Sequence, residues 1–168
     1  MKTPLRQSPQ TGFTLIELMV AIGLFMLAIG GVLANYNGFH TRQKVKQAAL
    51  TFKEHLRFAQ SEALTGKKPT GVGDPCVAKS LDGYTVTFTS ASDYVVGPVC
   101  ETIASIDTKT FSFPTGISLS PVSSISFQSL NGKVNSAADV DYVISDGTTS
   151  YKITVSSSGD ITDSGFVP

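Results

Sequence analysis

The feature that most constrains this chain is an apolar run from Phe13 to Ala34 that contains a single charged residue, Glu17. The run has about 22 residues, and as an α-helix it would extend about 33 Å, which is enough to cross a bilayer. A carboxylate near the centre of a membrane helix costs roughly 2.5 to 3.5 kcal/mol, so its presence indicates a function. We therefore expect a cation to meet Glu17.

The helical pattern continues beyond the apolar run, because no proline interrupts residues 13–65. Apolar side chains recur at spacings of three and four in the second part, at Val45, Ala48, Ala49, Phe52, Leu56, Ala59 and Ala63. Gly66, followed by Pro69, indicates the end of the helix. The sequence predicts one long helix, with a transmembrane and assembly part over residues 13–34 and an amphipathic part over residues 35–66.

The segment before the helix, residues 1–12, is polar, contains Lys2 and Arg6, and lacks an apolar period, which is typical of a leader. A secretory signal peptide cleaved after Ala34 is the alternative, since small residues precede that position. The length of the apolar run and the presence of Glu17 favour a retained helix.

Residues 67–168 have the composition of a β-rich head, in which Ser, Thr, Gly and Asp alternate with β-branched and aromatic residues. The alternation predicts six or seven short strands, including residues 84–88, 111–113, 117–119, 125–127, 142–144 and 151–155. No helical pattern separates them, so we expect an antiparallel sheet whose apolar face is covered by the amphipathic half of the helix. The predicted fold class is α+β.

The predicted head is acidic and contains both cysteines of the chain. Its net charge of −4 comes from six lysines and ten carboxylates, which argues against nucleic acid as a partner. If the head is exported, Cys76 and Cys100 are expected to form a disulfide that closes a loop of about 25 residues, worth roughly 3 kcal/mol. Two buried free thiols are the alternative.

Few residues of the sequence are candidates for a catalytic, metal-binding or cofactor-binding role. Asp139, Asp141 and Asp146 are weak calcium candidates, since their spacing does not match an EF-hand and turn roles also explain them. We interpret His40 and His55 as solvated helix positions. The sequence contains no nucleophile elbow, phosphate loop or clustered acid pair, so we expect neither an enzyme nor a cofactor.

The N-terminal residues resemble the type IV pilin-like family. In that family a basic leader ends at a glycine, a phenylalanine follows, and a glutamate is the fifth residue of the mature chain; Gly12, Phe13 and Glu17 occupy these places. The resemblance implies that a prepilin peptidase cleaves after Gly12 and methylates the new amine at Phe13. It also implies that Glu17 pairs with the Phe13 amine of a neighbouring subunit during assembly.

Short stretches of the remaining sequence are similar to the GspH/FimT group of minor pseudopilins and minor pilins. These are residues 56–64, residues 125–127 before Gly132, and residues 153–155 before Gly159. The similarity implies a structural subunit of a type II secretion pseudopilus or a type IV pilus. The implied partners are other pilin or pseudopilin subunits, the prepilin peptidase, the inner-membrane assembly platform and membrane lipid.

The implied location is the cytoplasmic (inner) membrane, crossed once, with the head outside the cytoplasm and, after assembly, in a periplasmic or cell-surface filament. A major pilin and a tip-located, ligand-binding or DNA-uptake minor pilin of the FimT kind are alternatives. Ala34 stands where major pilins often have a helix-kinking proline, and residues 159–163 are acidic where DNA-binding FimT proteins are basic. A monomeric membrane-anchored exported protein is a third possibility.

Overall fold

The computed structural model describes residues 12–101 and 103–168, so most of the predicted leader, residues 1–12, lies outside the described residues. The side chains of Ala28 and of residues 30–38 also lie outside them. The chain divides into two compact units, Met1–His40 and Thr41–Pro168. The helix α1, Leu15–Thr65, contributes residues to both units.

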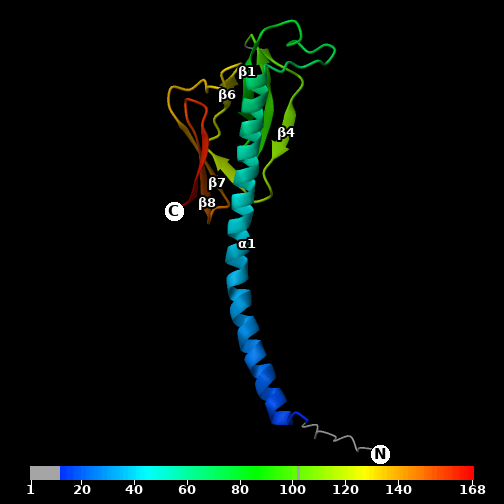
Figure 1. Ribbon diagram of the computed structural model, residues 1–168, viewed down its shortest axis with the longest axis vertical. Coiled ribbons are helices and arrows are strands. Elements are labelled where there is room, and N and C mark those ends of the chain that lie inside the picture. The colour runs from blue at the N-terminus through cyan, green and yellow to red at the C-terminus, as the bar shows by residue number, and fades with distance from the viewer. Residues whose placement is uncertain (1–11, 102) are drawn as a thin grey trace, which may run out of the picture. The chain divides into compact units, whose positions relative to one another are not determined.

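The predicted long helix is confirmed, and so is its end at Gly66 (Figure 1). Gly66 adopts a φ of 63°, a left-handed conformation that glycine accepts without a Cβ clash. Its N–H donates to Ala63 O over 3.1 Å, and the Lys67 N–H donates to Glu62 O over 3.2 Å. This pair of bonds is a Schellman motif, which satisfies carbonyl groups at the end of α1.

The membrane span expected over residues 13–34 stays a prediction. Within the described residues, no helix is long and apolar enough to cross a membrane. The predicted span includes Ala28 and residues 30–34, whose side chains are not among those described.

The described strands form two antiparallel sheets. The first sheet has the order β3-β2-β1-β6, and β4 also pairs with β2. Its strands are β1 Leu81–Phe88, β2 Asp93–Cys100, β3 Ile103–Ala104, β4 Lys109–Ser112 and β6 Ile125–Gln128. The second sheet has the order β5-β7-β8-β9, with β5 Ser118–Ser120, β7 Val140–Ser145, β8 Ser150–Val155 and β9 Ile161–Val167.

The α+β fold class is therefore confirmed, but the expected single sheet of six or seven strands is wrong. The structure places nine strands in two sheets within the described part of the chain. The pattern missed β2 because Gly97 and Pro98 interrupt it, and proline cannot donate to a ladder. It missed β9 because exposed polar residues occupy its middle, so no apolar alternation marks it.

Both sheets share one core with the second part of α1. Figure 1 shows the strands gathered beside that part of the helix. Phe52 is fully buried, and its ring centre lies 5.2 Å from that of Tyr94 on β2 and 5.5 Å from that of Tyr142 on β7. Both contacts are edge-to-face, which is a favourable aromatic geometry. The apolar stripe Val45, Ala48, Ala49, Phe52, Leu56, Ala59 and Ala63 is buried, as predicted.

A polar contact at the C-terminal end of the helix joins α1 to two connecting segments. Gln60 Nε2 donates to Gly159 O over 2.7 Å and to Gly132 O over 3.3 Å. Gly159 has a φ of +96°, and a Cβ there would lie 2.4 Å from Gly132 O. Only glycine fits this close approach.

We predict that Gly159→Ala destabilises the head by about 3 kcal/mol or more, because it combines a strained backbone with a clash. Gly147→Ala is the matched control, since Gly147 also has a positive φ of +91° but no atom within 4 Å of its Cβ position. We expect the control to cost only about 1 kcal/mol. Urea unfolding of the full chain in non-ionic detergent measures both, and equal losses would contradict the role of the contact.

Candidate functional site

The first turn of α1 begins immediately after the predicted Gly12/Phe13 junction. Thr14 is the N-cap residue: its Oγ1 accepts from the Glu17 N–H over 3.3 Å, and its carbonyl oxygen accepts from the Leu18 N–H over 3.1 Å. Glu17 thus stands at the third helical position, where the helix dipole favours a negative charge. The peptide bond between Gly12 and Phe13 lies outside the helix.

This N-terminal segment is strongly exposed in the single chain. Gly12 and Glu17 are exposed, and Phe13 is 85% exposed. Large apolar side chains around them are exposed too: Leu15, Ile16, Leu18, Met19, Val20, Ile22, Leu24, Phe25, Met26, Leu27 and Ile29. An apolar surface of this extent marks a contact region for other helices or for lipid.

In the head, the structure joins Cys76 to Cys100 by a disulfide, with Cα atoms 5.3 Å apart. Both residues are fully buried. The bond ties the segment between α1 and β1 to the end of β2. It closes a loop with a sequence separation of 24 residues.

A buried carboxylate beside the disulfide fixes the same segment. Asp74 is 5% exposed and accepts hydrogen bonds from the Cys76 N–H, from Ser105 Oγ and from the N–H groups of Ile106 and Asp107. Burial raises the pKa of this carboxyl, but the hydrogen bonds from Ser105 and the backbone outweigh burial and lower the pKa below its ordinary value. The sequence pattern did not reveal this contact.

The three calcium candidates are not brought together. Asp141, near the start of β7, accepts hydrogen bonds from Lys152 Nζ and Thr154 Oγ1 of β8. Asp146, in the turn after β7, accepts hydrogen bonds from backbone N–H groups of that turn. Asp139 accepts from a third segment through the Ser157 N–H. No cluster of three or more His, Cys, Asp or Glu side chains suited to a metal ion occurs in the described ranges. The calcium role of these aspartates stays a prediction, and the structure gives each of them protein partners instead.

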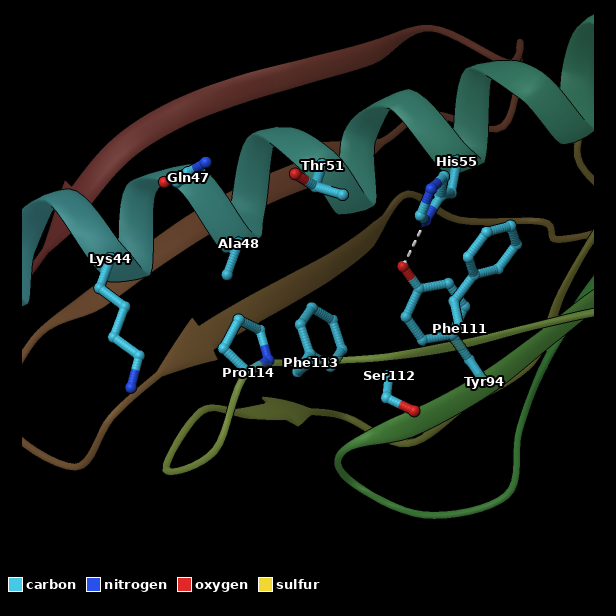
Figure 2. A pocket seen from close by; sticks show the side chains of 10 residues that line it. All are labelled: Lys44, Gln47, Ala48, Thr51, His55, Tyr94, Phe111, Ser112, Phe113 and Pro114. Carbon is cyan, nitrogen blue, oxygen red and sulfur yellow. Dashed lines mark hydrogen bonds between the residues drawn. The ribbon is translucent and has the colours of Figure 1, made fainter.

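His55 is not a solvated position, contrary to the sequence interpretation. Its ring stacks on that of Phe111 with centres 3.8 Å apart, and its Nδ1 lies 2.6 Å from Tyr94 Oη (Figure 2). It lines a pocket of about 280 Å³ between α1 and the segment that begins at β4. A spacing signal was available, because His55 follows Phe52 by three residues and precedes Ala59 by four, which places it within the buried stripe.

Two relationships to known families agree with this geometry. Residues 7–33 match the prokaryotic N-terminal methylation motif, and residues 48–159, more than half of the chain, match the type II transport protein GspH. The chain belongs to the GspH family. Together the two matches identify a type IV pilin-like subunit. Neither a curated protein nor a solved structure matches the chain.

The GspH match covers the buried second half of α1 and most of the two sheets. It includes Gln60, Gly132 and Gly159, which form the contact at the end of the helix. The methylation-motif match covers Gly12, Phe13 and Glu17. In this GspH-family chain the methylation-motif match covers the first part of α1, and the GspH match begins in the second part of the same helix and continues into the sheets.

His55 provides a prediction for the pH dependence of stability. Burial lowers the pKa of its imidazole below 6.5, and Glu54 only partly opposes this shift. The unfolded chain therefore binds more protons than the folded chain once the pH falls below about 6.5. The free energy of unfolding decreases as the pH falls below that value. We expect the wild-type free energy of unfolding to fall more steeply than that of His55→Gln between pH 7 and pH 5.5. Urea unfolding across this range measures both slopes, and identical slopes would contradict the assignment.

Proposed function

We propose that the chain is a structural subunit, either a pseudopilin of a type II secretion system or a minor pilin of a type IV pilus, and that it catalyses no reaction. Cleavage after Gly12 and methylation of the new amine at Phe13 would produce the mature subunit. The observation that carries the proposal is the arrangement of the first turn. A helix capped by Thr14 leaves the Gly12–Phe13 bond outside the helix and holds Glu17 within an exposed apolar surface.

The first turn supports pairing between subunits. Cleavage would create an amine at Phe13 with a pKa near 7.7 to 8, and it remains basic after methylation. That amine would lie just before the N-cap, where the positive end of its own helix disfavours a second positive charge. A carboxylate from Glu17 of a neighbouring subunit would neutralise it.

Such a pair would set the register between neighbouring helices. The surrounding side chains are apolar, so an unpaired charge among packed helices has a large desolvation cost. The two charges meet only at one axial stagger of the helices. Assembly in that register would therefore be favoured over other staggers.

The proposed partners are other pilin or pseudopilin subunits, the prepilin peptidase and the assembly platform of the cytoplasmic membrane. We place the N-terminal helix in that membrane with lipid around it, and the head outside the cytoplasm. The Cys76–Cys100 disulfide supports this location, since such bonds persist in oxidising compartments.

Glu17→Ala tests the assembly role. We expect cleavage to remain nearly intact, because the junction lies outside the helix, and we expect incorporation into sheared filaments to fall at least about tenfold. Immunoblotting of the membrane and filament fractions measures both. Glu54→Ala is the matched control, since it removes an exposed carboxylate from the second part of α1 and should assemble normally. Normal incorporation of Glu17→Ala would rule out the pairing.

The mass of the mature chain tests the processing. We expect the protein purified from filaments to begin at Phe13 and to carry one added methyl group on its amine. Gly12→Val should retain the leader, because it changes the residue before the cleaved bond. A mature chain that begins at Asn35 would instead show that a signal peptidase removes the helix.

A further inference from the structure

The pocket beside His55 is a groove with two different walls. Lys44, Gln47 and Thr51 of α1 form the polar wall. Phe111 and Phe113, on and just after β4, form the aromatic wall, and Figure 2 shows them facing the helix. The volume of about 280 Å³ accommodates one or two side chains of another molecule.

Lys44 is the one charged donor among the groove's lining residues, whereas Gln47, Thr51 and Ser112 can donate or accept. Lys44 Nζ donates to Thr115 O over 2.7 Å, which uses one of its three N–H groups. Tyr94 Oη lies 2.6 Å from His55 Nδ1, and either atom can be the donor. With the Tyr94 hydroxyl as the donor, the proton of the neutral His55 imidazole resides on Nε2 and is available to a ligand. No carboxylate lines this pocket.

The helix next to the groove carries exposed positive charge that the fold does not neutralise. Arg42, Lys44 and Lys46 are exposed, and none of them belongs to an ion pair found among residues 12–101 and 103–168. By contrast, four other lysines of the described residues form ion pairs: Lys53, Lys67, Lys79 and Lys152. The groove is thus lined by a cation and by no carboxylate, next to further exposed cations, on a head that is otherwise acidic.

We propose that this groove binds an acidic segment of a partner protein, with a carboxylate held by Lys44 Nζ and His55 Nε2–H and an apolar side chain placed against Phe111 and Phe113. Complementary charge supports this occupant, since Lys44 lines a groove that has no carboxylate among its lining residues, and the exposed Arg42 and Lys46 lie nearby on the same helix. The interaction is separate from assembly through the N-terminal helix. It requires neither cleavage after Gly12 nor the charge of Glu17.

Two other polyanions fit the groove less well. Nucleic acid needs many phosphate contacts, and the net charge of −4 from Gly66 onward repels it. Anionic lipid would attract Arg42, Lys44 and Lys46 about equally, because lipid headgroups recognise charge without a fixed pocket. In the structure the Lys44 ammonium is instead held by Thr115 O, and the half-buried imidazole of His55 adds a directional polar group to the groove.

The test uses the full chain in non-ionic detergent and a fluorescent, end-capped peptide of alternating aspartate and phenylalanine. We expect saturable binding by fluorescence anisotropy, and at least about tenfold weaker binding when asparagine replaces each aspartate. Lys44→Glu should weaken binding about tenfold or more. Lys46→Glu is the matched control, with the same charge change two residues away and outside the groove, and it should have at most about a threefold effect.

A second variant tests the groove without changing charge. Thr51 is an exposed helix residue that lines it, so Thr51→Trp should fill the groove and abolish peptide binding while the circular dichroism spectrum stays unchanged. Absence of peptide binding by the wild-type chain would overturn the proposal. Equal effects of Lys44→Glu and Lys46→Glu would overturn it as well, as would tighter binding to oligo-dT or to phosphatidylglycerol vesicles than to the peptide.

Discussion

The head depends on the packing of one helical stripe against two sheets. Phe52 contacts aromatic rings of β2 and β7, so a single side chain of α1 joins both sheets into one core. The two sheets also contact each other directly, since the ring centres of Phe88 on β1 and Tyr142 on β7 lie 5.7 Å apart. The loss of a buried phenylalanine typically costs about 3 to 5 kcal/mol, a large part of the stability of a domain of this size.

The same helix has one apolar surface that the head buries and a second apolar surface that stays exposed in the single chain. From Val45 to Ala63 its apolar side chains are buried against the sheets, whereas from Phe13 to Ile29 the described large apolar side chains are exposed. We propose that the second surface is covered by other subunits or by lipid, and that Glu17 restricts how those subunits pack. The proposed function rests on this division, since Thr41–Pro168 forms a compact unit of its own. The groove beside His55 adds a separate contact surface on the head.

Much of this architecture could be predicted from local patterns. The stripe from Val45 to Ala63 and the cap at Gly66 depend on spacing and on a glycine conformation, and both are properties of neighbouring residues. The division into two sheets could not be predicted, because it depends on which distant strands pair, and β9 carries no apolar alternation. The Asp74 contact and the stacking of His55 on Phe111 were missed for the same reason: each joins residues more than thirty positions apart.

The claim that one helical stripe holds both sheets together is tested most directly by native-state hydrogen exchange on the full chain in detergent. The account predicts that amides of residues 45–63 exchange with the same free energy as those of β1 and β7, and that this energy equals that of global unfolding. It also predicts that Phe52→Leu lowers the exchange free energies of residues 45–63, β1 and β7 by the same amount. Exchange of the helical amides at a clearly lower free energy, with both sheets still protected, would contradict it.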